Sequence, residues 1–247
     1  MVQLREDERL DYLLAEEEIR IIQSPTVFSF SLDAVLLGNF AGVPVKRGKI
    51  LDVCSGNGVI PLFLTRRSNA QITGVEIQER LVDMARRTME YNKLQEQVDF
   101  VHGDIRDMPK LLGNGKFDMV TCNPPYFQTP KVDQLNENEH HAIARHEIHG
   151  DLESIVKSIG ILARSGGKVA MVHRPNRLID LIELFRKYKI EPKRIRLVHP
   201  KHDKEANMVL IEGMRDGKPD VKLLPPLYVY HQDGTYTEEM QEILYGK

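Results

Sequence analysis

The sequence predicts an α/β fold built on a doubly wound, mostly parallel, seven-stranded sheet, with an antiparallel strand pair at one edge and a short N-terminal extension. Two observations lead to this prediction. From residue 49, short apolar strands alternate with amphipathic helices, which is typical of parallel sheets with crossover helices. Near the C-terminus, two β-rich runs at 194–200 and 206–214 are separated by a polar turn, which indicates antiparallel pairing.

The elements follow in a regular order. Residues 1–40 form an extension with a strand or hairpin followed by a helix, which we expect to pack on a domain at 41–247. In that domain we expect strands at 49–56, 70–77, 97–104, 116–125, 166–173, 194–200 and 206–214, with helices at 58–67, 78–94, 151–163 and 174–189. The tail after about residue 213 is expected to be irregular.

Composition excludes several classes of protein. Of the 247 residues, 41% are hydrophobic and 28% are charged, and the two cysteines form no disulfide framework. No apolar run is long enough to cross a membrane, and the acidic start lacks the apolar core of a signal peptide. We therefore expect a cytoplasmic protein with no membrane, no metal and no obligate protein partner.

A glycine-rich turn follows the first strand of the expected sheet. Asp52 lies near the end of this strand, and Gly56 and Gly58 open the next helix, where backbone amides can face a ligand. The dinucleotide fingerprint requires a third glycine where this chain has Pro61, so the pattern argues against NAD or FAD. A carboxylate here suits a ligand with an ammonium and a sulfonium, as in S-adenosylmethionine. A simple β–α turn is the alternative.

The next two strands also end in acidic residues. Glu76 is suited to accept hydrogen bonds from both ribose hydroxyls, and Asp104 to accept one from an adenine amine. Either residue alone could be a helix cap. Three acidic residues at one sheet edge together favour an adenosyl ligand.

The fourth strand runs into an NPPY motif, Asn123 to Tyr126. The prolines fix the backbone, so that the Asn123 amide oxygen and the Pro124 carbonyl become paired acceptors beside an aromatic ring. Paired acceptors can hold both hydrogens of a planar amine and leave its lone pair available, while Tyr126 stacks on the base. Catalysis would then rest on positioning and electrostatics. A packed Asn-Pro turn is the alternative.

With these motifs the sequence resembles the class I S-adenosylmethionine-dependent amino-methyltransferases, which have a Rossmann-like fold. Order and spacing are most similar to the bacterial tRNA(Val) adenine-N6 methyltransferase family, which modifies the adenosine beside the anticodon. The resemblance covers nearly the whole chain. It implies a catalytic group, Asn123, Pro124 and Tyr126, and a cofactor-binding group, Phe28, Ser31, Asp33, Asp52, Gly56, Gly58, Glu76, Asp104 and Asn123.

The NPPY motif alone specifies a planar amine as the methyl acceptor, and it does not specify which molecule carries that amine. Residues 160–204 hold twelve Lys or Arg against four Asp or Glu, which suits phosphate contacts. The sequence therefore favours adenine N6 in RNA, most of all tRNA, with substrate contacts at Pro125, Phe127, Arg145, Arg174 and Lys201. Guanine N2 in RNA, a protein glutamine, and a non-catalytic RNA-binding factor remain as alternatives.

A polar stretch at 127–149 interrupts the alternation and is expected to be a substrate-facing loop. Four of its residues are histidines, but a metal site requires carboxylate or thiolate companions in fixed geometry, which a polar loop without periodicity does not obviously supply. We expect no metal there.

Overall fold

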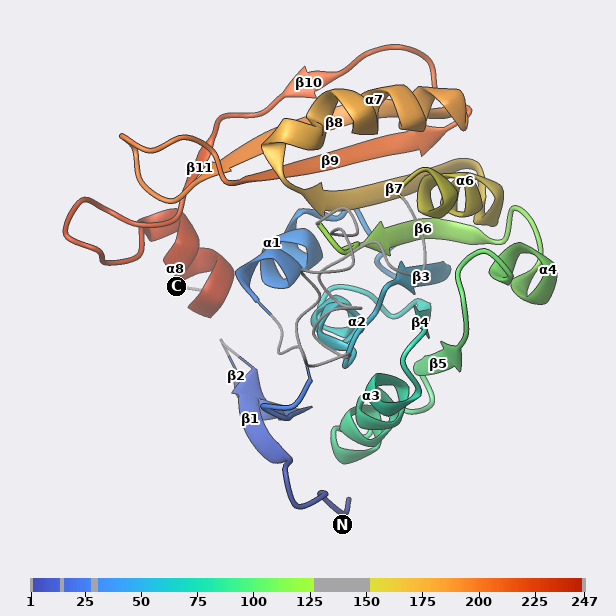
Figure 1. The fold of residues 1–247 in the computed structure, drawn as a ribbon, viewed down its shortest axis with the longest axis vertical. Coiled ribbons are helices and arrows are strands. Elements are labelled where there is room, and N and C mark those ends of the chain that lie inside the picture. The colour runs from blue at the N-terminus through green and yellow to red at the C-terminus, as the bar shows by residue number, and fades with distance from the viewer. Residues whose placement is uncertain (1, 14–15, 28–30, 127–151, 246–247) are drawn as a thin grey trace, which may run out of the picture.

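The computed structural model describes residues 2–13, 16–27, 31–126 and 152–245 (Figure 1). The strands are β1 (Arg9–Leu13), β2 (Glu16–Gln23), β3 (Lys49–Val53), β4 (Gln71–Glu76), β5 (Val98–His102), β6 (Phe117–Cys122), β7 (Ala163–His173), β8 (Ile190–His199), β9 (Met208–Arg215), β10 (Lys222–Leu223) and β11 (Leu227–Tyr228). The helices are α1 (Leu32–Phe40), α2 (Val59–Thr65), α3 (Glu79–Tyr91), α4 (Met108–Leu112), α6 (Leu152–Leu162), α7 (Leu178–Lys187) and α8 (Glu238–Tyr245).

The central sheet confirms the predicted fold class. Its main strands run in the order β8-β9-β7-β6-β3-β4-β5, and the two-residue strands β10 and β11 add to β8. Strands β3 to β7 pair in parallel, whereas β9 pairs antiparallel with both β7 and β8. The carboxyl ends of the parallel strands therefore meet at one edge, which we call the carboxyl edge.

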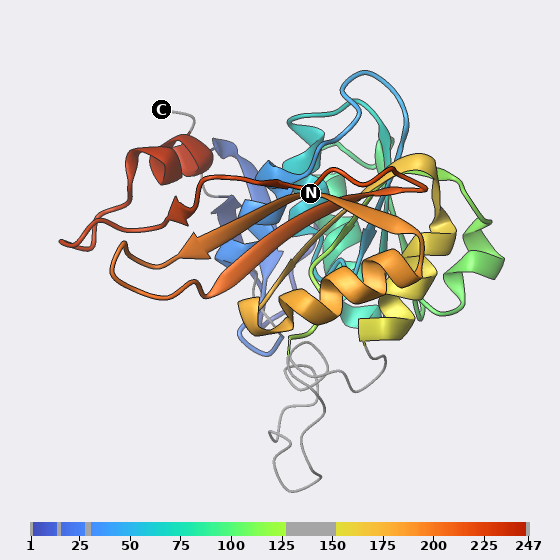
Figure 2. The same cartoon turned by 90° about the horizontal axis from the view of Figure 1, so that it is seen from above.

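Helices cover both faces of the sheet (Figures 1 and 2) and pack on it through two apolar layers. One core cluster joins the sheet to α1, α2, α3 and α8, and the other joins it to α4, α6 and α7. Successive residues of β7 alternate between the layers, since Val169 and Met171 belong to the second cluster and Ala170 and Val172 to the first. This alternation places the next residue, His173, on the side of α6 and α7.

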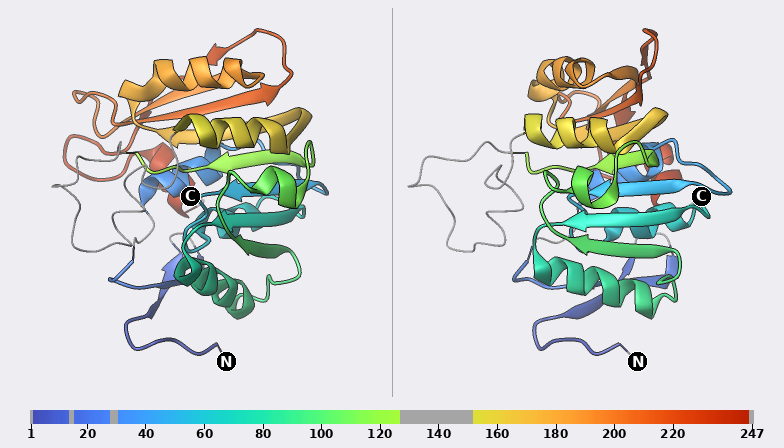
Figure 3. Two further views of the ribbon diagram at one scale, coloured as in Figure 1. Left: turned by 45° about the vertical axis from the view of Figure 1, so that its right-hand side comes forward. Right: turned by 90° about the vertical axis from the view of Figure 1, so that its right-hand side faces the viewer.

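The N-terminal strands form an antiparallel hairpin outside the main sheet. Ile22 and Val27 pack with Leu81 and Met84 of α3, so that the hairpin lies beside this helix (Figure 3). No helix among the described residues is long and apolar enough to cross a membrane.

The tail after residue 213 differs from the expectation of irregular structure, because it contains β10, β11 and α8. The amide of Met240 donates to Thr237 Oγ1 at 3.3 Å, in the manner of an N-cap, and Met240 and Leu244 are buried. This spacing of four residues gives the short helix an apolar face.

Candidate active site at the carboxyl edge

The glycine-rich turn between β3 and α2 adopts left-handed backbone angles. Cys54, Gly56 and Gly58 have φ values of 58°, 57° and 86°. A Cβ at Gly58 would lie 2.9 Å from the ring of Phe100, whereas one at Gly56 would meet nothing within 4 Å. Because Gly58 has no side chain, the turn can pack closely against Phe100 of the core. Gly56 instead leaves open space over the turn, as a ligand would require.

Asp52 lies beneath this turn and is fully buried. Its carboxylate accepts hydrogen bonds from the hydroxyls of Ser55 at 2.7 Å and Thr121 at 2.6 Å. Burial raises the pKa of Asp52 to about 7. The structure thus shows Asp52 tying β3, the turn and β6 together. Its predicted contact with the cofactor stays a prediction.

Glu76 and Asp104 lie at the ends of the next two strands. Glu76 accepts hydrogen bonds from the amides of Gly56 and Gln78, both at 2.9 Å. Its burial raises its pKa, although these amides act in the opposite direction. Asp104 accepts the amide of Arg106 at 2.8 Å and forms an ion pair with its guanidinium. Glu76 thus lies at the glycine-rich turn, and Asp104 follows the neighbouring strand β5.

The NPPY turn follows β6. Pro124 is buried, and Asn123 and Tyr126 are half-buried. The Tyr126 hydroxyl donates to Asp33, and its oxygen lies 2.6 Å from Oδ1 of Asn123. Ser31 donates to the second carboxylate oxygen of Asp33. The entry segment and the NPPY turn thus meet, although they are about ninety positions apart in sequence.

Two further side chains from the end of β7 lie against Tyr126. The ring centroids of His173 and Tyr126 are 5.2 Å apart, and the Arg174 guanidinium lies 5.2 Å from the Tyr126 centroid. Arg174 also donates to the carbonyl of Asn207, before β9, at 3.1 Å. The predicted substrate residue Arg174 therefore lies at the site. His173 was not singled out from the sequence, although an HRP run at a strand end was a signal for it.

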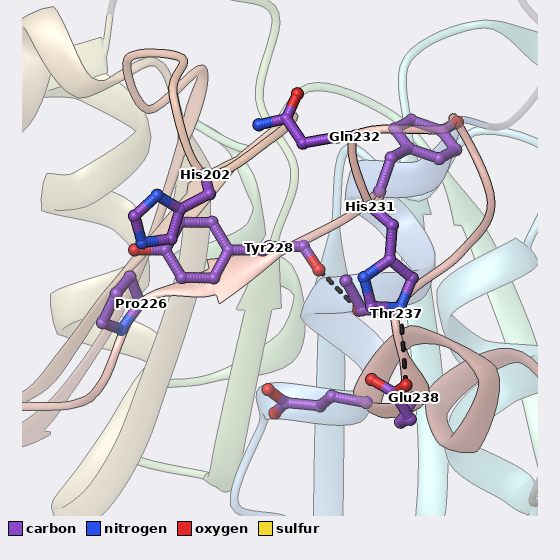
Figure 4. A pocket seen from close by; sticks show the side chains of 9 residues that line it. His202, Pro226, Tyr228, His231, Gln232, Thr237 and Glu238 are labelled. Carbon is purple, nitrogen blue, oxygen red and sulfur yellow. Dashed lines mark hydrogen bonds and ion pairs between the residues drawn. The ribbon is translucent and has the colours of Figure 1, made fainter.

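Lys201 lies further along the same edge, in the turn between β8 and β9. Its ammonium donates to the carbonyl of Gln232 at 3.0 Å. A cavity of about 360 Å³ opens beside this contact, between the turn and the C-terminal segment. Figure 4 shows its lining, which includes His202, Tyr228, His231, Gln232, Thr237 and Glu238. Lys201 is thus separated by β9 and β7 from the NPPY turn after β6.

Some predicted residues cannot be placed. Phe28, Phe127 and Arg145 lie outside the described residues, as does the stretch 127–149 with its four histidines. Among the residues that are described, no three His, Cys, Asp or Glu side chains gather as metal ligands would.

The site fits an adenosyl cofactor. Open space over Gly56 adjoins the buried carboxylate of Glu76, whose oxygens have lone pairs left for ribose hydroxyls. Asp104 supplies a further acceptor at the end of β5. The strand order and these acidic strand ends define a class I methyltransferase that uses S-adenosylmethionine.

Comparisons with known proteins also indicate a methyltransferase. Residues 50–145 match the family model described as "Methyltransferase domain". A predicted O-methyltransferase from Agrobacterium tumefaciens superposes with a TM-score of 0.70 at 18% identity, covering 86% of this chain and 95% of the other, which shows the shared fold. Geranyl diphosphate C-methyltransferase from Streptomyces coelicolor, solved with S-adenosyl-L-homocysteine, superposes with a TM-score of 0.55 at 14% identity, covering 74% and 79%.

Relatives in sequence identify the family within the methyltransferases. A tRNA1(Val) (adenine(37)-N6)-methyltransferase from Porphyromonas gingivalis is 30% identical over 199 residues, covering 78% of this chain and 76% of the relative. The protein of that name from Shewanella sediminis is 25% identical, covering 87% and 90%. The one from Shewanella sp. strain MR-4 is 39% identical, but there the alignment spans about half of each chain, 47% and 48%. The chain belongs to the tRNA1(Val) (adenine(37)-N6)-methyltransferase family.

Proposed function

We propose that this protein transfers a methyl group from S-adenosylmethionine to the N6 amine of an adenosine in tRNA, beside the anticodon, in the cytoplasm. The observation that carries the proposal is the contact of Asn123 with Tyr126 and, through it, with Asp33, at the edge where the acidic strand ends gather. The names of the relatives support tRNA and adenine 37 as substrate and position. Anticodon-loop bases are unpaired, so extracting one requires little unstacking.

The proposed roles follow from the positions of the side chains. Glu76 and Asp104 bind the adenosyl group, together with the backbone at Gly56 and Gly58. Asn123 Oδ1 and the Pro124 carbonyl accept the two hydrogens of the target amine. When bound, S-adenosylmethionine supplies an electrophilic methyl carbon on a sulfonium. The amine nitrogen forms a bond to this carbon as the sulfur–carbon bond breaks, and the surplus amine proton leaves to solvent, so that no strong base is required.

Asp33 and Tyr126 orient the amide of Asn123. The phenol has one proton, and both Asp33 and the oxygen placed at Asn123 Oδ1 lie within its reach. A carboxylate is the stronger acceptor, so the proton belongs on the side of Asp33. The amide then turns its nitrogen to the phenol oxygen as donor, since the two ends of an Asn amide are assigned by such networks. This orientation directs the amide oxygen to the target amine.

The test is a methyl-transfer assay with labelled cofactor on unmodified tRNA, ribosomal RNA and cell protein, followed by nucleoside analysis. N6-methyladenosine should form in tRNA, and Asn123→Ala should reduce the rate by about a hundredfold or more while the cofactor still binds. Asn69→Ala is the control, because Asn69 is exposed and precedes β4 at the opposite edge. Product at guanine N2 or in protein would overturn the adenine assignment, and RNA binding without transfer would favour a binding factor.

A further inference from the structure

His173 has a buried polar atom that the proposed roles leave unused. The residue ends β7 and is fully buried. Its Nε2 has no hydrogen-bond partner among the residues that the structure describes. Buried polar groups in folded proteins are nearly always paired, so this atom requires an explanation.

The hydrogen bond at the other ring nitrogen, Nδ1, determines whether Nε2 is a donor or an acceptor. The backbone amide of Arg174 donates to Nδ1 of His173 at 2.8 Å, so Nδ1 is the acceptor and the ring proton lies on Nε2. Burial and the nearby Arg177 lower the pKa of His173 to about 4. At neutral pH the imidazole is therefore uncharged and carries one N–H donor.

The ring that carries this donor packs on Tyr126 of the NPPY turn. The imidazole is in ring contact with Tyr126, whose oxygen is 2.6 Å from Asn123. A second buried atom without a partner in the described part of the chain, Oδ1 of Asn207, belongs to the neighbouring segment that Arg174 holds through the Asn207 carbonyl. Two buried polar atoms without a partner in the described part of the chain thus lie at the end of β7 and at the start of β9, on the segments beside the NPPY turn.

We infer that the Nε2–H of His173 donates to a ring nitrogen of the target adenine and so selects the base that Asn123 receives. The inference rests on the proposed function. In adenine, the N6 amine has an acceptor nitrogen on either side, N1 on the pairing edge and N7 on the major-groove edge. A donor beside the acceptor Asn123 matches this pattern. Guanine presents a carbonyl oxygen in place of the amine and does not match it.

The test uses tRNA in which the target adenosine is replaced by 1-deazaadenosine or 7-deazaadenosine, each of which loses one of these ring nitrogens. With wild-type enzyme, we expect kcat/KM to fall about tenfold or more for one analogue and to change little for the other. In His173→Phe, which keeps an aromatic ring and removes the donor, adenosine itself should lose the same factor. The variant should no longer distinguish the analogues.

His173→Phe also removes the Nδ1 acceptor of the Arg174 amide, so we expect its thermal midpoint to fall, with cofactor affinity unchanged. A purely structural role for His173 would lower the rate on all three bases alike and keep the wild-type ratio between the two analogues. His199→Phe is the matched control, because His199 ends β8 at the same edge and contacts Tyr228 instead. Equal rates on both analogues with wild-type enzyme would overturn the inference, and so would full activity of His173→Phe. Failure of wild-type enzyme to methylate adenosine in any RNA would instead overturn the proposed function.

Discussion

The phenol of Tyr126 lies between Asp33 and Asn123 and has one proton for two neighbours. Replacing Tyr126 by Phe removes the group that orients the Asn123 amide while leaving the acceptors of the amine in place. We expect kcat to fall about tenfold, the effect of one neutral hydrogen bond in the transition state. Asp33→Asn should have a similar effect. Single-turnover rates measured at saturating cofactor and RNA will test both variants.

The cofactor dissociation constant separates this role of Asp33 from the cofactor contact that the sequence predicts. Unchanged cofactor affinity with a reduced rate supports orientation of Asn123. Weaker cofactor binding at an unchanged saturated rate would show that Asp33 binds the methionine end of the cofactor instead.

Asp52 predicts an unusual dependence of stability on pH. Burial raises its pKa from 3.8 to about 7, so between about pH 4 and pH 7 the folded chain holds a proton that the unfolded chain releases. The free energy of unfolding therefore falls as pH rises through this interval, by at most about 1.4 kcal/mol per pH unit, and levels off above it. In Asp52→Asn this contribution is absent. As pH rises from 5 to about 7, the thermal midpoint of the wild-type protein should fall relative to that of Asp52→Asn. Between about pH 7 and pH 8 the difference between the two midpoints should stay constant.

An equal offset between the two proteins at every pH would contradict this prediction. It would mean that the hydroxyls of Ser55 and Thr121 keep the carboxylate ionised despite its burial.

Residue types and spacing predicted the candidate site only in part. The strand-end acids and the NPPY turn are local patterns, and they were found because each carries its chemistry in a few consecutive residues. The contacts of Tyr126 with Asp33 and His173 join segments far apart in the chain. Periodicity contains no information on such contacts, which is why His173 was missed and why the hydrogen bond of Asp52 to Thr121 was not predicted.

At the scale of elements, the alternation of strands and helices predicted the parallel sheet and the antiparallel pair β8–β9. These elements could be predicted because their apolar residues recur at the spacing of a strand or a helix. The two-residue strands β10 and β11 are too short to show a period, and α8 covers only eight residues. Their formation depends on pairing with β8 and packing on the core, which local sequence does not report.

The hairpin β1–β2 is attached to α3 by a buried ion pair. Arg87 donates to both carboxylate oxygens of Glu8, at 2.6 and 2.7 Å, and the Glu8 side chain is fully buried. Arg87→Ala removes both guanidinium hydrogen bonds from that carboxylate, which keeps the Arg5 amide at 2.9 Å and the Arg5 guanidinium at 4.0 Å. We therefore expect a loss of about 2 kcal/mol in the free energy of unfolding. Urea unfolding, with hydrogen exchange in β1 and β2, measures the effect.

A second variant distinguishes loss of the pair from loss of the arginine alone. Glu8→Gln combined with Arg87→Met removes both charges and should recover most of the stability. The exposed Arg47 provides a control, and Arg47→Ala should change the free energy of unfolding by less than about 0.5 kcal/mol. A loss for Arg87→Ala no larger than that of the control would show that the hairpin does not depend on this pair.

At the scale of the whole molecule, the formal charge of −2 conceals an uneven distribution. The end of β8 leads into Lys201 and Lys204 at the carboxyl edge, whereas the end of the antiparallel β9 leads to Lys218 away from it. If tRNA lies across the carboxyl edge, phosphate contacts belong to the first pair of lysines. Lys201→Ala with Lys204→Ala should weaken tRNA binding about tenfold at low salt, with little effect on the saturated rate.

The salt dependence of tRNA affinity shows whether the weaker binding comes from lost phosphate contacts of these two lysines or from the change in net charge. Each lost phosphate contact should reduce the slope of log affinity against log salt concentration by about one. Lys218→Ala with Lys222→Ala removes the same charge from exposed positions and should leave this slope unchanged. If both double variants weaken binding equally, net charge alone attracts the RNA and the carboxyl edge has no special role in phosphate binding. A change confined to the first pair would place the tRNA backbone along the edge that carries Asn123 and His173.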